Sequence, residues 1–346
     1  MAINLKMLSE SLGLSQTTVS RALNGFPEVS QKTRERVLEA ANRLNYQPSQ
    51  SAASLATGRS RAIGHVVPIS THNMINPHFA DFVAGAGEEY ARLGYDMVIR
   101  VVDAADELQV YRDLAQRHRV DGLVIHGPKV DDPRLPLLES LKVPFVVHGR
   151  SDHYNGNYSW LDVDNRRAFH RATRLLTDLG HRRIALINGI EDMNFAARRR
   201  QGFEDALADA GITPDPALMY SSDMIEPYGH DATVELLSLA EPATAIVTSS
   251  ILPALGVVRA LAELGLRSGR DVSILTYDDC LSFLKPPGLG ATPYFTSVRS
   301  SIHAAGAAVA RMLIDLIEGN AAEPVSELWE AELVIGQTTG PVANRP

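Results

Sequence analysis

Apolar residues at three- and four-residue spacing predict three short helices at the start of the chain, over residues 4–11, 15–23 and about 30–45. Each predicted helix begins at a residue whose side chain can cap free backbone amides. These residues are Asn4, Ser15 and Ser30. The apolar faces of three such helices can enclose one small core, so this segment is expected to fold as a unit.

From residue 61 onward, short apolar segments alternate with amphipathic helical segments. The predicted strands include residues 63–67, 97–99, 122–125, 145–147, 184–187, 245–247 and 272–275. This alternation predicts an α/β domain whose parallel sheets are covered by helices on both faces. A ligand of such a domain lies beyond the carboxyl ends of the strands, so the residues directly after each strand are candidates for its site.

The charge of the chain divides near the same place as the hydrophobic pattern. The 346 residues carry a formal net charge of −8, with 33 basic and 41 acidic side chains. Residues 1–61 hold eight Lys and Arg against four Asp and Glu, a net of +4, which leaves 25 basic and 37 acidic side chains, a net of −12, for the rest. The basic head is the part suited to nucleic acid, because phosphates bind Lys and Arg.

Composition also bears on the compartment and on cofactors. Cys280 is the single cysteine, which excludes an internal disulfide and a thiolate metal cluster built from this chain. No stretch of 18 uncharged apolar residues is present, and the N-terminus lacks a charged leader followed by a long apolar run. We therefore expect a cytoplasmic protein that binds no membrane, metal or cofactor.

The second predicted helix exposes side chains that can read DNA bases. Gln16 can bond adenine at two positions, Arg21 can bind the two acceptor atoms of guanine, and Thr17 can donate to a base or contact a thymine methyl group. Small polar groups nearby suit phosphate oxygens, which position a protein without specifying sequence. These groups belong to Ser15, Thr18, Ser20, Asn24, Ser30, Thr33 and Tyr46. The spacing alone fits an ordinary three-helix packing unit with a polar face equally well.

Three sequence segments decide between these two interpretations. Residues 14–24 read LSQTTVSRALN, residues 29–37 read VSQKTRERV, and residues 44–48 read LNYQP. This nearly continuous match over about sixty residues resembles the LacI/GalR (lactose repressor) family of transcriptional regulators. The resemblance implies that a hinge helix follows the head and that Leu55, with Ala56, enters the minor groove of operator DNA, where an inserted apolar side chain bends the duplex.

The resemblance also implies the domain organisation. It continues through residues 121–122, 179–185, 254–256 and 276–279. The expected parts are a helix-turn-helix head at 1–47, a hinge at 48–60, and a two-lobed, periplasmic-binding-protein-like (type I) effector-binding and dimerisation domain at 61–346. The N-lobe is expected at 61–162 and 293–323, and the C-lobe at 163–290 and 324–346. A homodimer is expected on palindromic DNA, because two heads raise affinity through effective concentration.

Two charged residues are central to the implied effector site. Arg199 matches an arginine that contacts ligand in this family, and Asp278 matches an acidic ligand contact after a strand. A guanidinium and a carboxylate can each hold two adjacent hydroxyl groups, so the expected effector is a small sugar. Some details resemble the sequences of regulators of α-glucoside or related disaccharide operons, namely residues 14–18, residues 148–150 and Trp160.

Further candidates lie near the ends of the predicted strands. Aromatic rings can stack on the C–H faces of a pyranose, and polar side chains can bond its hydroxyls, although core packing and capping are the alternative roles. The aromatic candidates are Phe79, Trp160 and Phe195, and the polar ones are Asn76, His78, His148, Arg150 and Asp162. Ser250 and Ser300 stand where the family usually has other polar residues, which weakens two ligand contacts.

An enzyme with a DNA-binding head, such as a sugar kinase, is the alternative class. It would need phosphate-binding glycines, but Gly85 and Gly87 fall in a predicted helix without a third glycine, and no Walker lysine motif or Gly-x-Ser-x-Gly elbow is present. An architectural DNA binder would have no use for an acidic body with a polyol site. We therefore expect a non-enzymatic repressor of a carbohydrate-utilisation operon, with a regulator that senses a non-sugar co-repressor as the alternative.

Overall fold

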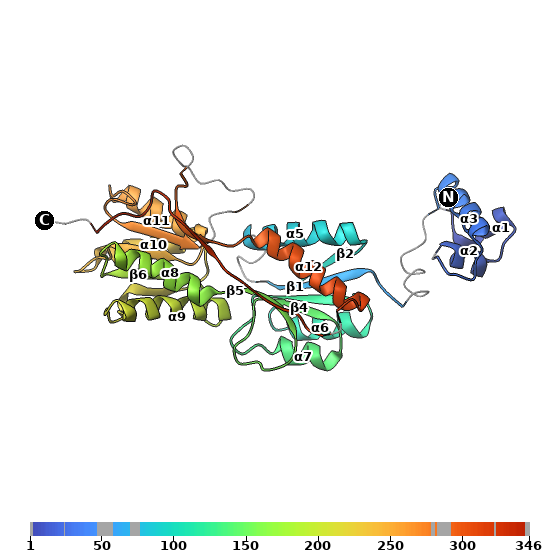
Figure 1. The fold of residues 1–346 in the computed structure, drawn as a ribbon, viewed down its shortest axis with the longest axis horizontal. Coiled ribbons are helices and arrows are strands. Elements are labelled where there is room, and N and C mark those ends of the chain that lie inside the picture. Colours follow the sequence, from blue (N-terminus) through green and yellow to red (C-terminus); the bar gives the residue numbers. More distant parts are fainter. Residues whose placement is uncertain are drawn as a thin grey trace.

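The computed structural model describes residues 3–23, 25–46, 58–69, 77–277, 281, 292–321 and 323–342. These residues form a small helical head and two α/β lobes (Figure 1). Among them, no helix is long and apolar enough to cross a membrane. The His, Cys, Asp and Glu side chains in these ranges also form no group of three or more that could hold a metal ion.

The head contains α1 (Leu5–Leu12), α2 (Gln16–Leu23) and α3 (Gln31–Arg43), as the hydrophobic spacing predicts. One aliphatic side chain from each helix is fully buried in a shared core, namely Leu8, Val19 and Val37. The predicted caps are confirmed, because Asn4, Ser15 and Ser30 each accept a hydrogen bond from the backbone amide three residues later. These caps satisfy amides that have no partner inside the helix and so fix where each helix begins.

The N-lobe is built on a six-stranded parallel sheet with strand order β11-β5-β4-β3-β1-β2. Its strands are β1 (Ala62–Pro68), β2 (Asp96–Val102), β3 (Gly122–His126), β4 (Phe145–His148), β5 (Ser159–Val163) and β11 (Ser326–Trp329). Helices α5 (Pro77–Leu93) and α12 (Ile302–Glu318) cover one face, and α6 (Glu107–Gln116) and α7 (Arg134–Leu141) cover the other. Each face therefore encloses its own apolar core.

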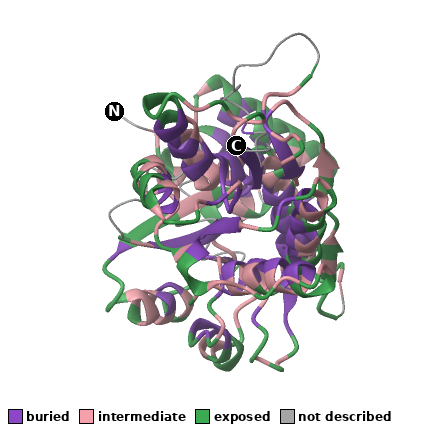
Figure 2. Cartoon of the chain, turned by 90° about the vertical axis from the view of Figure 1, so that its left-hand side faces the viewer, coloured by how far each residue is buried: buried purple, intermediate pink, exposed green. Residues whose placement is uncertain are grey.

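The C-lobe repeats this architecture with strand order β12-β10-β9-β8-β6-β7, in which only the β10–β12 pair is antiparallel. Its strands are β6 (Ile184–Asn188), β7 (Met219–Ser221), β8 (Ala245–Thr248), β9 (Ser273–Tyr277), β10 (Thr296–Arg299) and β12 (Glu332–Val334). Helices α8 (Asn165–Asp178) and α9 (Asn194–Asp209) cover one face, and α10 (Glu226–Ser238) and α11 (Ile251–Glu263) cover the other. Figure 2 shows the buried residues concentrated in the sheets and on the inner sides of the helices.

The described chain crosses between the lobes three times: from β5 to α8, from β10 to α12, and from β11 to β12. Two of the expected lobe boundaries are therefore wrong. Strand β10, expected in the N-lobe, pairs with β9 in the C-lobe sheet, and β11, expected in the C-lobe, pairs with β5 in the N-lobe sheet. Strand β11 pairs with β5 over a long sequence separation, and a local hydrophobic pattern reveals the sheet of neither strand.

Glycines bring the helices that cover the sheets into close contact. A Cβ on Gly85 of α5 would collide with the carbonyl oxygen of His303 on α12, and one on Gly306 of α12 would collide with the carbonyl oxygen of Phe82. The same relationship holds for Gly202 of α9 against Arg166 of α8. Gly85 thus has a packing role, as the absence of a phosphate-binding pattern around it suggests.

Candidate functional site

The exposed face of α2 holds the three predicted base-reading residues. Gln16, Thr17 and Arg21 are all exposed, and they line one open hollow of the head together with Leu5, Ser20 and Phe26. The opposite face of α2 is buried through Val19 and Ala22. Packing of the buried side thus directs the three polar side chains outward together, which is the arrangement that a helix needs in order to enter a major groove.

The predicted phosphate-contacting hydroxyls have local partners in the head. Ser15 Oγ lies 2.8 Å from Thr18 Oγ1, and Ser30 Oγ lies 2.9 Å from Thr33 Oγ1, in addition to the capping bonds. Ser20 and Tyr46 are half-buried, and burial raises the pKa of Tyr46. Asn24, Leu55 and Ala56 lie outside the described residues. The hydroxyls of Ser15 and Ser30 therefore cap helix starts, and those of Thr18 and Thr33 bond the capping hydroxyls.

Arg199 on α9 is the buried cation of the C-lobe. Its side chain lies 3.8 Å above the ring centroid of Tyr277 and 4.8 Å from that of Phe195, and the residue is only 6% exposed. Its Nε donates to Asn165 Oδ1 at 2.8 Å, and its Nη1 donates to the carbonyl oxygen of Ser249 at 2.6 Å. Aromatic stacking and directed hydrogen bonds thus fix the guanidinium at the carboxyl edge of the C-lobe sheet.

The two lobes meet beside this guanidinium. His78, in the first turn of α5, lies with its Nε2 2.8 Å from Oγ of Ser250, the N-cap of α11. Burial, followed by the positive charge of Arg199, lowers the pKa of His78 to about 4, against the opposing effect of Asp81. At neutral pH, His78 is therefore a neutral group that can donate or accept one hydrogen bond on each ring nitrogen.

Three further histidines cluster at the N-lobe side, under α5. His65 Nδ1 lies 2.9 Å from His126 Nε2, and His148 lies with its ring centroid 6.5 Å from that of His126. Phe79 and Phe82 of α5 pack edge-on against His126, with interplanar angles of 85° and 88°. Burial lowers the pKa of His65 to about 3 and of His148 to about 4, and it holds that of His126 well below its usual value. The cluster is therefore uncharged at neutral pH.

His126 is a candidate that the sequence analysis missed. It is the last residue of β3 and half-buried at the carboxyl edge of the sheet, next to His148 at the end of β4. The reasoning that selected His148, a polar residue at the end of a predicted strand, applies to His126 without change.

Trp160, Arg150 and Asp162 form a second group on β5 and the end of β4. The Arg150 guanidinium lies 5.2 Å above the Trp160 ring, and its Nε donates to Asp162 Oδ2 at 3.0 Å. Trp160 packs against the core on the α6 and α7 face, whereas Phe79 packs with the histidines under α5. The structure thus places Phe79 and Trp160 on opposite faces of the N-lobe sheet.

Asp162 has an unusual carboxylate. Burial raises its pKa to about 6, which outweighs the lowering effects of Arg150 and Arg198 and of the hydrogen bond from the Val163 amide. Its other oxygen, Oδ1, accepts from Asn165 Nδ2 at 3.3 Å. Asp162 is therefore a carboxyl group that titrates close to physiological pH in the middle of a polar network.

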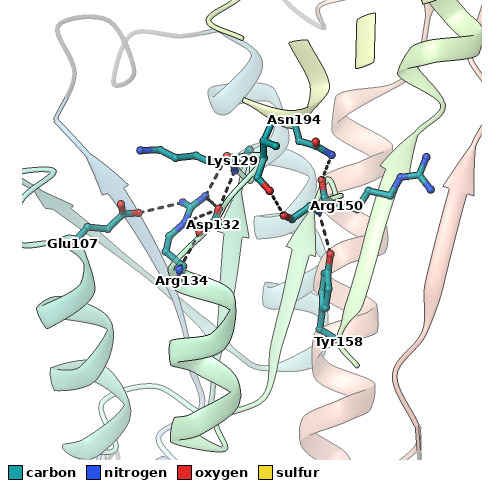
Figure 3. Close-up of polar contacts among 10 residues, drawn as sticks. Glu107, Lys129, Asp132, Arg134, Arg150, Tyr158 and Asn194 are labelled. Carbon is teal, nitrogen blue, oxygen red and sulfur yellow. Dashed lines mark hydrogen bonds and ion pairs between the residues drawn. The ribbon is translucent and has the colours of Figure 1, made fainter. Parts of the chain in front are cut away.

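A backbone contact joins the lobes near this network. In this lobe contact, which we define as residues 127–130 against residues 192–194, the Val130 amide donates to the Asp192 carbonyl at 3.0 Å and the Asn194 amide donates to the Pro128 carbonyl at 2.9 Å. Asn194 Nδ2 also donates to the Arg150 carbonyl oxygen (Figure 3). An ion pair between Arg198 and Asp152 lies beside it.

A buried charge cluster holds the N-lobe side of the lobe contact. Arg134, whose side chain is 8% exposed, forms ion pairs with Asp132 at 2.6 Å and with Glu107 at 3.1 Å. It also donates to the carbonyl oxygen of Gly127, and Asp132 accepts from the Lys129 amide at 2.9 Å (Figure 3). Because each charge in the cluster has a partner, the loop presents its backbone to the C-lobe in a fixed conformation.

The remaining predicted effector residues are distributed as follows. Phe195 and Ser250 lie with Arg199 in the C-lobe, and Ser300 is half-buried in the crossing between β10 and α12. Asn76 and Asp278 lie outside the described residues. The structure therefore brings Arg199, Phe195, Ser250 and His78 together at one place where the lobes meet.

Two families match parts of this chain. Residues 10–49 match the family described as bacterial regulatory proteins of the lacI family, and residues 173–339 match the periplasmic binding protein-like domain. The chain is also 45% identical over 345 residues to the HTH-type transcriptional regulator AglR of Rhizobium meliloti (strain 1021), a match that covers 100% of this chain and 96% of AglR.

Solved structures are similar over nearly the whole chain. The complex of the transcriptional regulator CelR with cellobiose has 31% sequence identity and a TM-score of 0.72, covering 97% of this chain and 99% of that one. The lac repressor dimer bound to operator and the anti-inducer ONPF has 28% identity and a TM-score of 0.82, covering 98% of this chain and 100% of that one. The similarity therefore includes the head and both lobes.

Proposed function

This chain belongs to the LacI family of DNA-binding transcription regulators, and from that premise we propose that it represses a carbohydrate-utilisation operon under the control of a small sugar. The effector is proposed to be a disaccharide such as an α-glucoside. The proposed effector site rests on one observation: Arg199 lies beside the hydrogen bond between His78 of the N-lobe and Ser250 of the C-lobe. A ligand bound there would contact both lobes at once.

The chemistry of this place suits an uncharged polyol. Arg199 presents a fixed guanidinium that can bond adjacent hydroxyl groups, and Phe195 offers a ring beside it. The histidines on the N-lobe side are neutral, so they add hydrogen-bonding groups without adding positive charge. A phosphorylated ligand would gain more from a site with several cations. The CelR structure contains cellobiose, which supports a disaccharide as the class of ligand.

Operator binding is proposed to use Gln16, Thr17 and Arg21 for base contacts in a homodimer. The lac repressor structure is a dimer bound to operator, and it supports this arrangement. Because the effector would contact both lobes, it would favour one lobe orientation and thereby change how well two heads reach their half-sites together. A typical coupling of about 1–3 kcal/mol corresponds to a change in operator affinity of roughly five- to 150-fold.

We propose no enzymatic reaction for the chain, in keeping with AglR and CelR, which are transcriptional regulators. Because its proposed target is operator DNA, the protein is proposed to act in the cytoplasm.

Thermal unfolding of the full chain with a panel of mono- and disaccharides tests the effector site. A sugar at 100 times its dissociation constant adds about 2.7 kcal/mol to the free energy of unfolding and raises the midpoint. Arg199→Ala should abolish that shift relative to its own midpoint, and Arg199→Lys, which keeps the charge but loses the planar fork, should reduce it. Arg174→Ala on α8, an exposed arginine in the same lobe, is the matched control and should keep the full shift.

The sugar that binds is then added to an operator-binding assay on palindromic DNA selected with the protein. A fall in operator affinity would identify an inducer, and a rise would identify a co-repressor. Binding of the sugar without any change in operator affinity would contradict the proposed coupling. If no sugar raises the midpoint, the effector is a metabolite of another class.

A further inference from the structure

Three polar side chains form a hydrogen-bonded relay from α5 to the edge of the N-lobe sheet. The Tyr90 hydroxyl lies 3.2 Å from His65 Nε2, and His65 Nδ1 lies 2.9 Å from His126 Nε2. Tyr90 is 1% exposed and His65 has no exposed surface, so solvent does not reach either group. His126 is half-buried, and its ring is the last member of the relay, at the carboxyl edge of β3.

The hydroxyl proton of Tyr90 sets the direction of the hydrogen bonds in this relay. Within the described residues, His65 Nε2 is the one hydrogen-bond partner of the hydroxyl. If His65 carried its proton on Nε2, the buried Tyr90 proton would have no acceptor, and leaving a buried donor unsatisfied disfavours that arrangement on the order of five- to 150-fold. The hydroxyl therefore donates to His65 Nε2, and neutral His65 carries its proton on Nδ1.

The tautomer of His65 determines the tautomer of His126. His65 Nδ1–H must donate to His126 Nε2, so His126 accepts there and carries its own proton on Nδ1. Burial keeps the pKa of both histidines far below neutrality, which leaves each ring with a single proton. Among the described residues, no hydrogen bond to His126 Nδ1 is present, so its N–H has capacity for another molecule.

His126 lies against α5, the helix whose first turn contacts the C-lobe. Phe79 and Phe82 pack edge-on against the ring at 5.3 and 4.8 Å and prevent it from turning. His78, the residue before Phe79, already contacts Ser250 of the C-lobe. A molecule bound between Arg199 and His78 would therefore lie close to the edge of the sheet that His126 occupies.

We propose that Tyr90 and His65 are positioning residues that fix His126 as an Nδ1–H donor to an acceptor oxygen of the bound effector. This proposal rests on the proposed effector function. The acceptor is a hydroxyl, ring or glycosidic oxygen of a polyol, so the relay makes the regulator select ligands with an oxygen that can accept at this point. An analogue that lacks that oxygen leaves the N–H without a partner and binds more weakly.

Histidine-selective 15N NMR of the ligand-free full chain reads the tautomers directly. The His126 signals are assigned by their loss in His126→Phe, and both His126 and His65 are expected to be protonated on Nδ1. Tyr90→Phe removes the hydroxyl donor. Either direction of the His65–His126 hydrogen bond then leaves one His65 nitrogen unsatisfied, so His126 should show a mixture of tautomers. Tyr95→Phe is the matched control, because Tyr95 belongs to the same buried core and its hydroxyl has no hydrogen-bond partner among the described residues.

Calorimetric titration of the same variants with maltose, trehalose, sucrose and cellobiose tests the contact to the effector. For the sugar that binds, His126→Phe should weaken affinity about two- to twelvefold, the value of one hydrogen bond. Tyr90→Phe should weaken it by a smaller factor, and Tyr95→Phe should leave it unchanged.

Protonation of His126 on Nε2 in the wild-type protein would overturn the relay, and unchanged affinity in both Tyr90→Phe and His126→Phe would overturn the contact. If the wild-type protein binds none of the four sugars, the disaccharide function fails together with the contact, while the tautomer result still decides whether the relay exists.

Discussion

Asp162 and Arg199 bind the two ends of one amide group across the first crossing between the lobes. Asn165 Nδ2 donates to Asp162 Oδ1 at 3.3 Å, and Asn165 Oδ1 accepts from Arg199 Nε at 2.8 Å. Asp162 belongs to β5 of the N-lobe and Arg199 to α9 of the C-lobe. Since Arg150 bonds the other oxygen of Asp162, a continuous polar network runs from the end of β4 to the proposed effector site.

The first prediction concerns the amide in this network. Asn165→Ala removes these two hydrogen bonds and a third, from Nδ2 to the Val163 carbonyl, and it leaves the Nε group of the buried Arg199 without this partner, so the free energy of unfolding should fall by about 1–3 kcal/mol. Effector affinity should fall as well, because the guanidinium loses an orienting contact. Urea denaturation and calorimetric titration measure the two effects. Asn320→Ala, at an exposed asparagine, is the control and should change stability by no more than about 0.5 kcal/mol.

The second prediction concerns pH. The pKa of Asp162 is raised from 3.8 to about 6 in the folded state, so the folded protein binds more protons than the unfolded chain between these values. The contribution of Asp162 to stability should therefore fall as pH rises from about 4 to 6, by on the order of 2–3 kcal/mol for this side chain, which is 7% exposed.

Asp162→Asn should remove this contribution, and the comparison of urea unfolding for the two proteins from pH 4 to 8 isolates it. The comparison is needed because buried His78 and His148, whose pKa values are lowered to about 4, act in the opposite direction. They contribute stability above about pH 6.5 that is lost as pH falls toward 4. A difference between the two proteins that is independent of pH would show that Asp162 does not titrate in this range.

The sequence predicted the local structure well because local signals determine it. The caps Asn4, Ser15 and Ser30 mark the starts of the three head helices, and the predicted strand at residues 122–125 lies within β3. The places where the chain crosses between lobes could not be predicted in the same way. Strands β10 and β11 are short, and each could join either sheet until its partner strand is known.

The candidate site shows the same limit. Arg199, Ser250 and His78 were selected separately, and the structure brings them together. Trp160 and Phe79 are both aromatic candidates from the sequence, but alternate residues of a strand point to opposite faces of the sheet, and Trp160 packs on the face toward α6 and α7. That choice depends on which helices cover each face, which the sequence of β5 does not contain.

The third prediction separates base reading from phosphate binding in the head. Arg21→Ala should weaken binding to the selected operator by about 1–3 kcal/mol while leaving binding to unrelated DNA nearly unchanged, because a guanidinium that contacts a base carries sequence information. Lys32→Ala, at an exposed lysine in the first turn of α3, is the comparison and should weaken both by similar factors. Fluorescence anisotropy with both DNAs at several salt concentrations measures these effects. Equal losses on the two DNAs for Arg21→Ala would contradict a base-reading role.

The last prediction concerns the lobe contact at residues 127–130 and 192–194. Gly127 has φ +47°, and a Cβ there would lie 2.7 Å from Met193 Cε across the lobes. Gly211 has φ +67° with no atom within 4 Å of an added Cβ, so Gly127→Ala and Gly211→Ala carry similar backbone strain but only the first presses on the other lobe.

Both variants should therefore lose about 1 kcal/mol of stability from that strain. Only Gly127→Ala should also lose effector affinity, by less than about fivefold, because the flexible end of Met193 can shift and relieve most of the overpacking, which acts only in the state where the lobes touch. The end of Met193 is the obstacle, so adding Met193→Ala should restore affinity without restoring the stability lost to strain. If Gly127→Ala and Gly211→Ala bind effector equally well, the contact between these two segments does not take part in effector binding.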